Sequence, residues 1–409
     1  MRDRWSGWLA GAALCTGFYC GSLAAAVENT WEISWDGEAY GYLSHMDLRE
    51  QSLLNPDNSI ARLPEKSATV ELRLNLRAQR DNLQLTMRPI LLAQENRTDI
   101  DSWQQREGYL SQWQIRLQSS ESWSLSGGRE ILNWGPAQFA SLASPFYFDN
   151  GRSNPLRELS GVDNAKLLWA PDREQSLSLA WITGSGHDRE DVWRDTWLLK
   201  AEHRGDEWAG GLVVSQTPDL DPFFGLYGQR TVSDALLLYA EARSSTLANA
   251  LSSPADAAQP FTIATPSLRR TDALLGAAYA FESGQSINLE YLHYGHGYTA
   301  DEEEAYFARA ESSLLWAAQA LSYAPALLGR DYLYLAWQSN PLESYGYWRL
   351  MATHSLTDHS RKLSAYVEYK LSDSVTALAL GELAGEHERQ EFSDIYHSTL
   401  TLGLKAALP

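Results

Sequence analysis

The chain has 409 residues, with 33 Lys and Arg against 52 Asp and Glu, and its formal net charge is -19 at pH 7. Because phosphate binding needs clustered positive charge, this balance argues against a nucleic-acid partner. The two cysteines, Cys15 and Cys20, both lie near the N-terminus. Disulfides and thiolate metal sites are therefore not expected in the rest of the chain.

The first 26 residues are typical of a secretory signal. Arg2 and Arg4 precede an apolar run over residues 5–19, and Ala24 to Ala26 supply the small side chains of a cleavage site. We expect a signal peptide at 1–26 and a mature chain at 27–409, with a retained membrane anchor as the alternative. No later apolar run reaches the length of about 18 residues that a transmembrane helix needs.

Residues 68–92 show the pattern that recurs along the chain. From Val70 to Arg77, apolar side chains alternate with polar or charged ones, and the alternation resumes at Leu83 after a turn. Side chains of a strand point alternately to its two faces, so the segment predicts a hairpin with one apolar and one charged face. A barrel with lipid outside and water inside suits both faces. A soluble sheet packed on a core has the same period.

The connections between candidate strands alternate between short turns and long loops. The long ones are expected at residues 43–67, 93–107, 134–161, 246–270, 297–329 and 384–396. Bacterial outer-membrane barrels show this alternation together with an even number of strands. The pattern predicts an all-β fold, a transmembrane antiparallel up-and-down β-barrel of about 18 strands, within a range of about 16–20.

Two segments do not follow from strand alternation alone. The strand at 223–230 is included partly because omitting it would break the alternation of long and short connections. Residues 301–322 depart from the period of a strand and end before Pro325, which predicts one short helix in an external loop.

If the apolar side chains face lipid, the polar ones between them face the lumen. The predicted pore-lining residues are Arg73, Arg77, Arg88, Arg116 and Glu71. Such charges can orient polar solutes as they pass. The alternative is that they are ordinary wall charges, solvated or paired with neighbours.

The segment 134–161 is unusually aromatic for an external loop. Aromatic rings are poorly placed in bulk water, so we expect this loop to fold into the barrel mouth. Ring faces beside Asp, Asn and Arg also suit a sugar, although loop packing without a ligand is the favoured explanation for any single ring. The predicted constriction or ligand residues are Trp134, Phe139, Phe146, Tyr147, Phe148, Asp149, Arg152, Arg157 and Glu158.

A short motif in this region resembles one in porin-like outer-membrane barrels of Gram-negative bacteria. It consists of Gly128-Arg129, Trp134-Gly135 and a return through 154–157. The wider layout is similar to that of eighteen-stranded barrels such as the maltoporins, the alginate exporter and the capsule-assembly barrels. This resemblance implies the handling of small solutes or polysaccharide.

The sequence thus predicts a porin-like channel in the outer membrane for small polar solutes, sugars among them, in contact with lipid and lipopolysaccharide. A closed-lumen barrel that exports or attaches capsular or exopolysaccharide is the first alternative, and an outer-membrane hydrolase is the second. For a hydrolase, Glu158 and Asp163 are the candidate carboxylate pair. A soluble secreted binding protein is a further possibility. No catalytic residue, metal site or cofactor is expected.

Overall fold

The computed structural model describes residues 30–187, 192–340, 345–387 and 389–409. The signal peptide predicted at 1–26 lies outside these residues. The barrel strands are β1 (Glu32–Leu48), β2 (Lys66–Arg80), β3 (Leu83–Arg97), β4 (Ser102–Gln118), β5 (Trp123–Glu130), β6 (Val162–Trp169), β7 (Gln175–Gly184), β8 (Thr196–Arg204), β9 (Trp208–Gln216), β10 (Phe223–Thr231), β11 (Leu236–Ser245), β14 (Arg270–Ala280), β15 (Ser286–Tyr294), β16 (Asp331–Gln338), β17 (Gly346–Ser355), β18 (Arg361–Lys370), β19 (Val375–Ala384) and β20 (Tyr396–Leu408).

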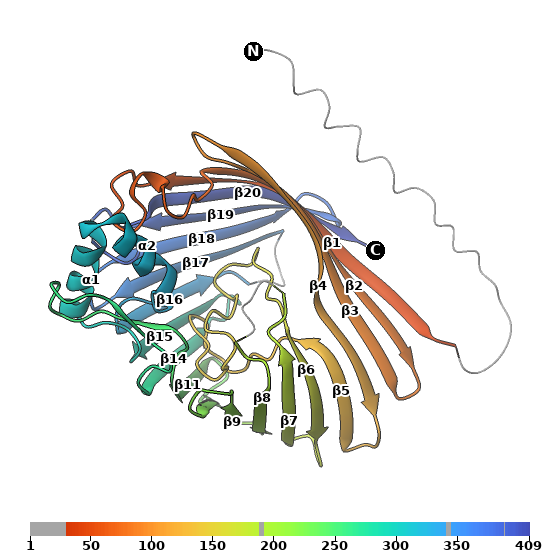
Figure 1. Cartoon of the computed structure of the whole chain (residues 1–409). Helices are drawn as coiled ribbons and strands as arrows, with labels where there is room; N and C mark the ends of the chain where they lie inside the picture. The colour runs from red at the N-terminus through yellow and green to blue at the C-terminus, as the bar shows by residue number, and fades with distance from the viewer. Residues whose placement is uncertain (1–29, 188–191, 341–344, 388) are drawn as a thin grey trace.

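These strands form one closed antiparallel sheet (Figure 1). Neighbours in the chain are neighbours in the sheet, and β1 pairs with both β2 and β20, so no edge is left open. Over the described residues the barrel has 18 strands. The predicted all-β fold and strand number are confirmed, including the strand expected at 223–230, which is β10.

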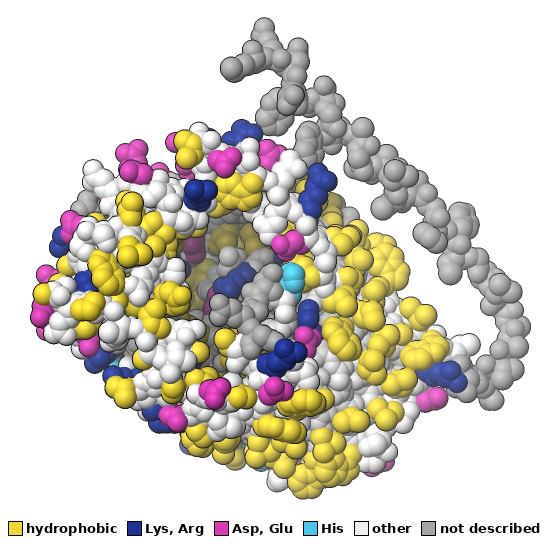
Figure 2. Space-filling view, viewed as in Figure 1, with side chains coloured by type: hydrophobic (Ala, Val, Ile, Leu, Met, Phe, Trp, Pro, Cys, Tyr) yellow, Lys and Arg dark blue, Asp and Glu magenta, His cyan; other side chains and the backbone are white. Residues whose placement is uncertain are grey.

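The apolar side chains of the strands cover the outside of the barrel. Val70 is 64 % exposed and Leu43 is 65 % exposed, whereas Glu71 on the opposite face is 5 % exposed. Figure 2 shows hydrophobic side chains gathered over the outer wall. In a soluble protein these residues would be buried between two layers. Their exposure on the outside of a closed barrel indicates a lipid-facing surface.

Exposed tryptophans lie near both ends of this apolar surface. Trp123, Trp169 and Trp208 stand where strands meet short turns, and Trp181 and Trp197 stand near the opposite ends of β7 and β8. Aromatic side chains are favoured at the two membrane–water interfaces. A closed barrel with this surface is an outer-membrane protein, as the sequence predicted.

One of the predicted long loops is wrong. The connection expected at 93–107 is only four residues long, because β3 and β4 continue to Arg97 and from Ser102. The pairing shifts register between Arg88 and Pro89, where the extra residue of β4 is Ser111. Residues 94–99 and 104–107 are polar at successive positions, so the simple alternation that marks a strand is lost although both strands continue there.

The stretch predicted as one helix contains two. α1 (Ala300–Ser312) begins with a capping box formed by Thr299 and Glu302. Ser313 then has extended backbone and its side chain caps α2 (Leu314–Tyr323), which separates the two helices. Among the described residues, neither helix is long and apolar enough to cross a membrane.

The long loops at one end of the barrel share a hydrophobic core of their own. It joins Leu54, Phe261, Phe307 and Ala320, and Ile395 packs against it. The loops that carry these residues follow β1, β11, β15 and β19, which lie on different sides of the ring. We call them the external cap; it comprises residues 49–65, 246–269 with the small hairpin β12 (Ala250–Ser252) and β13 (Thr262–Ala264), 295–330 and 385–395.

Candidate functional site

The connection between β5 and β6, residues 131–161, lies inside the barrel (Figure 1). We call it the inner loop. Its residues Leu132, Phe146 and Tyr147 are buried in a cluster with wall residues such as Ile182 of β7. The inner loop thus packs against the wall, and the contacts below describe how it is held.

A carboxylate of β11 binds the first turn of the inner loop. Glu241 is 2 % exposed, and its Oε1 accepts the backbone N–H of Ala137 at 2.9 Å. Its Oε2 accepts the N–H groups of Leu142 at 2.9 Å and Ala143 at 3.2 Å. A buried loop must find partners for its backbone donors, and this side chain supplies three at once.

A second carboxylate, from β15, binds the same turn. Glu290 is 1 % exposed and accepts the N–H groups of Gln138 at 2.6 Å and Phe139 at 2.8 Å. The hydroxyl of Tyr239 on β11 donates to Glu290 at 2.6 Å. Two acidic side chains from separate strands thus accept five backbone donors of one turn, which fixes its position against the wall.

Gly135 lets the turn approach this clamp closely. Its φ is +98°, and a Cβ there would lie 2.1 Å from Oε1 of Glu241. The guanidinium of Arg152 closes the turn from the other side, because it donates to the carbonyls of Gly135 at 3.2 Å, Pro136 at 2.9 Å and Ala137 at 2.5 Å. A side chain at position 135 would therefore displace the carboxylate.

The inner loop also contacts the wall at β17. Nη1 of Arg349 donates to the carbonyl of Arg152 at 2.7 Å, and its Nη2 donates to Tyr334 Oη and Gln138 Oε1, both at 3.3 Å. Arg349 is 7 % exposed. Its charge is used to hold the loop.

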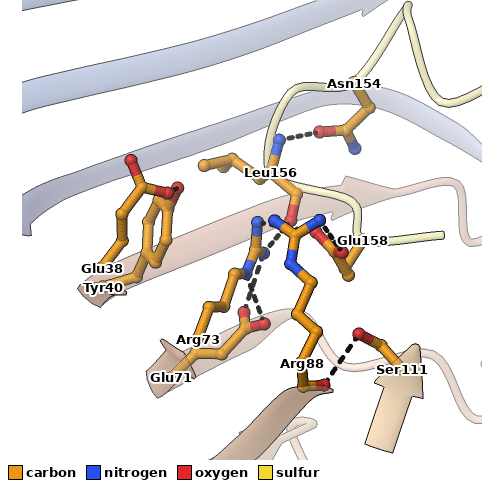
Figure 3. A network of polar contacts seen from close by, with 9 residues as sticks. All are labelled: Glu38, Tyr40, Glu71, Arg73, Arg88, Ser111, Asn154, Leu156 and Glu158. Atoms are coloured by element: carbon orange, nitrogen blue, oxygen red, sulfur yellow. Dashed lines mark hydrogen bonds and ion pairs between the residues drawn. The ribbon is translucent and has the colours of Figure 1, made fainter. Parts of the chain in front are cut away.

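The returning part of the loop meets β2 and β3 in a charged network (Figure 3). Arg73 pairs with Glu71 at 2.7 Å and donates to the carbonyl of Leu156 at 2.6 Å. Glu158 accepts from Arg88 at 2.9 Å and lies 3.5 Å from Arg73. Burial raises the pKa of Glu158, while the two arginines act in the opposite direction.

Leu156 completes the contact across the lumen. It is buried with Tyr40 of β1, Tyr366 of β18, and Leu378 and Leu380 of β19. The inner loop therefore starts at β5, is clamped at β11 and β15, and reaches the wall formed by β17 to β3. It thus contacts the wall on several sides of the ring.

The predicted pore-lining residues divide into two groups. Arg73 and Glu71 face the lumen but are 5 % exposed, because the inner loop covers them. Arg77 is exposed, and Arg88 and Arg116 are partly exposed, with Arg116 donating to Gln118 Oε1 at 3.3 Å. Arg88 of the second group pairs with Glu158 of the inner loop. Figure 2 shows the barrel hollowed, with basic side chains inside.

The aromatic side chains predicted in the loop mostly pack against protein. Phe139 stacks on Tyr334 at 5.2 Å, and Phe148 lies 5.1 Å from Tyr294. Phe146 and Tyr147 are buried. The ammonium nitrogen of Lys200 lies over the ring of Trp134, 5.3 Å from the ring centroid. Their faces are used in packing, which supports the alternative that the sequence left open for each single ring.

The charged residues near the tip of the loop are more accessible. Asp149 and Arg157 form an ion pair, and both side chains are more than a third exposed. Arg152 is also exposed although it holds the turn.

The carboxylate pair considered for a hydrolase does not form. Glu158 binds Arg88 and Arg73, whereas Asp163 binds Arg129 at 2.8 Å. Each acid is thus neutralised by its own arginine. Within the described ranges, no three His, Cys, Asp or Glu side chains are grouped so as to hold a metal ion.

The sequence did not reveal Glu241, Glu290 or Arg349 as site residues. Each lies far along the chain from the loop that it holds, and each looks like one more lumen-facing charge on an alternating strand. The one available signal was an acidic residue between large apolar and aromatic neighbours, which many barrel strands contain.

No protein-family model and no curated protein matches the sequence. Among solved structures, the chain is similar to a triple mutant of Rhodopseudomonas blastica porin, with 10 % identity and a TM-score of 0.47. Another mutant of that porin also has 10 % identity, with a TM-score of 0.48. Both alignments cover 92 % of this chain and 100 % of the porin. The barrel fold rests on the strand pairing described above, and this distant similarity adds no functional residue.

Proposed function

We propose that the protein is an outer-membrane channel for small polar solutes, sugars included, and that the inner loop sets the width of its lumen. The observation that carries the proposal is the attachment of residues 131–161 to the inside of a closed barrel by side chains of several strands. A wall lined by charged and amide groups suits solutes that bring their own hydrogen-bonding groups.

The charges beside the loop support the choice of polar solutes. Arg88 and Arg116 lie on the wall, and Arg152, Arg157 and Asp149 lie on the loop that faces it. Opposed charges across a narrow, water-filled passage orient dipolar molecules and oppose apolar ones. Passage, and not catalysis, is what this arrangement favours, because the buried acids of the site are bound to arginines or to backbone N–H groups.

The test is conductance in planar lipid bilayers. The intact protein should give small discrete openings, and deletion of residues 139–152 should increase the current of each opening several-fold. A matched control deletes part of the short turn 232–235, which lies away from the loop. Silence of both the intact protein and the loop deletion, in barrels shown to be folded, would contradict the channel.

A closed-lumen barrel for polysaccharide is the second candidate. The external cap favours it, because loops from different sides of the ring meet in one core at one end of the barrel. For this candidate, the intact protein should be silent and should retain polysaccharide on immobilisation, whereas removal of the cap or the inner loop should produce openings.

A further inference from the structure

Helix α1 of the external cap has two differently bound faces. On a helix, residues three, four and seven positions apart lie on the same face, which places Glu303, Tyr306, Phe307 and Ala310 together. All four are buried. Arg309 lies to the side of this face. Tyr306 on the face packs against Phe261, with the ring centroids 5.6 Å apart, whereas Glu303 faces other loops.

The Arg309 side of α1 is firmly attached to residues 246–269. Its guanidinium donates to the carbonyls of Gln259 at 2.6 Å and Asp256 at 3.0 Å, and to Ser253 Oγ at 2.7 Å. The hydroxyl of Ser253 donates in turn to the carbonyl of Glu302 at 2.7 Å. These bonds contain no group that changes its charge near neutral pH, so this attachment is constant.

The Glu303 side meets acidic residues. Glu303 is 2 % exposed, and the charged groups that act on it are Asp358, between β17 and β18, and Glu391, between β19 and β20. As carboxylates, Glu303 and Asp358 have only acceptors to offer each other, so an ionised Glu303 has no hydrogen-bond partner for either oxygen. With a proton on Glu303, its carboxyl group can donate to Asp358.

The two facing acids hold their own loops together. Asp358 accepts the N–H of Glu391 at 2.7 Å, and Glu391 accepts the N–H of Leu328 at 3.0 Å and the hydroxyl of Tyr332 at 2.5 Å. Asp394, which also acts on Tyr306, accepts the hydroxyl of Ser52 at 2.7 Å. The contact between Glu303 and Asp358 is therefore one of the points at which α1 joins a connected set of three other loops. The ion pair between Glu311 of α1 and Arg389, at 2.5 Å, and the packing of Phe307 are other such points.

We propose that this contact is a proton-operated latch: a proton on Glu303, shared with Asp358, holds α1 against the loops after β17 and β19, and its release lets α1, with the attached residues 246–269, move away from these two loops and from the mouth. The inference rests on the proposed function for its biological meaning, because opening the mouth matters only if solute passes. The movement itself does not depend on passage.

The latch has a definite pH dependence. Burial raises the pKa of Glu303 to about 10, and the neighbouring Asp358 and Glu391 act in the same direction. A carboxyl group freed by opening returns to its ordinary pKa near 4.5, so opening releases a proton at any pH between these values. The closed state is therefore most stable at low pH. Between the two pKa values, the ratio of closed to open molecules falls about tenfold for each unit by which the pH rises.

A second proton steepens this dependence at acidic pH. Burial also raises the pKa of Glu391, to about 7. If opening exposes Glu391, two protons are released between pH 4.5 and pH 7, and the population ratio changes by about a hundredfold per unit there. Above pH 7 only the Glu303 proton contributes. The contributions of Glu303 and Glu391 can therefore be separated, because substituting each residue should change the pH dependence of the closed-to-open ratio in a different pH range.

The experiment measures exposure of the Glu303 face in the folded, membrane-reconstituted protein. Ala310 is 2 % exposed and Leu315 on α2 is 75 % exposed. We take the rate at which a thiol reagent labels the A310C variant and divide it by the rate for L315C at the same pH. In this labelling ratio, the effect of thiol ionisation on the rates cancels. We expect this ratio to rise about tenfold per unit between pH 7 and pH 9.

Two variants identify the proton. Glu303→Gln keeps a donor for Asp358 and cannot ionise, so it should flatten the dependence above pH 7 and keep the cap closed. Glu391→Gln should leave that range unchanged and reduce the slope only below pH 7. A ratio that is constant with pH in the unsubstituted background, or an unchanged slope in E303Q, would overturn the latch.

A divalent cation between the same carboxylates is the competing explanation. If so, millimolar Ca²⁺ should lower the labelling ratio and a chelator should raise it, and such a response would also overturn the proton latch. Conductance is recorded in parallel. If the protein gives channel openings but neither the openings nor the labelling ratio depend on pH, the latch is rejected and the channel is not. If the labelling ratio depends on pH but no current is seen, the channel is rejected and the latch is not.

Discussion

The inner loop and the external cap are both built from connections between strands, and both contain buried acids, yet the acids do opposite things. Glu241 and Glu290 face five backbone N–H groups, which remain donors at every pH. Glu303 faces Asp358 and Glu391, which are acceptors when ionised. The comparison teaches that a buried acid can be held by backbone donors or can face other acids, and that the partner decides whether it fixes a loop or forms a contact that needs a proton.

The difference also separates two kinds of motion. Loss of a clamp acid should free the inner loop at all pH values, whereas the cap should respond to pH and to the packing of its core. The inner loop would then set the width of the passage, and the cap would set access to it. Four substitutions test this division.

The largest effect is expected for Glu241→Ala. The substitution leaves the N–H groups of three residues buried without acceptors, and each costs about 1–3 kcal/mol, so the attachment of the loop should weaken by about 5 kcal/mol. Amide hydrogen exchange over residues 137–143 should accelerate accordingly. The control is Glu382→Ala on β19, which contacts Ser364 and Lys362 and not the loop; equal acceleration in both would reject the clamp.

Next in size is Phe307→Ala in the cap. Phe307 is 0 % exposed in the cap core, and removing a buried aromatic ring costs about 3–5 kcal/mol. Because the strands do not depend on this ring, the cap should become sensitive to protease while the barrel still resists heating in detergent. Leu315→Ala, at an exposed position of α2, should change neither property, and melting of the whole barrel in F307A would show that cap and barrel are not separate units.

A smaller effect is expected for Gly135→Ala. The new Cβ meets the Glu241 carboxylate, and the positive φ disfavours a side chain, so the clamp should lose about 2 kcal/mol. Channel openings should become noisier as the loop fluctuates. Gly41→Ala serves as the control, since nothing lies within 4 Å of its added Cβ. Unchanged noise in G135A would mean that the turn adapts without moving the carboxylate.

The smallest change is expected for Tyr306→Phe. The Tyr306 hydroxyl is buried without a hydrogen-bond partner, although the ring packs in the cap core. Removing an unpaired buried hydroxyl should leave the cap equally stable or stabilise it by up to about 1 kcal/mol. Protease sensitivity of the cap is the measurement. A clear loss of stability would reveal that this hydroxyl has a partner in solution, such as a water molecule.

The fold was accessible from the sequence because a strand in a barrel wall has a simple constraint. Lipid on one face and water on the other impose alternation with period two, as between Val70 and Arg77, and this pattern needs no knowledge of distant residues. The prediction failed at 93–107 for the same reason. Residues 94–99 and 104–107 are polar at successive positions, so the local rule no longer describes strands that continue there.

The aromatic residues of the inner loop indicated from the sequence that this segment needs a surface to pack on. The residues that hold it were not predictable. Glu241, Glu290 and Arg349 belong to strands whose alternation would be the same with any polar side chain at those positions. Their role depends on closure of the barrel, which brings β11, β15 and β17 around one turn of residues 131–161.

The sequence by itself determined that this chain forms a membrane barrel, because the alternation is a property of neighbouring residues and of the two solvents that they face. Only the tertiary structure decided which charges are free in the lumen and which are fixed. Arg77 and Arg73 lie on the same face of the same strand, yet one is exposed and the other is covered by the loop. The reason is that burial and pairing depend on what the closed sheet brings opposite each side chain.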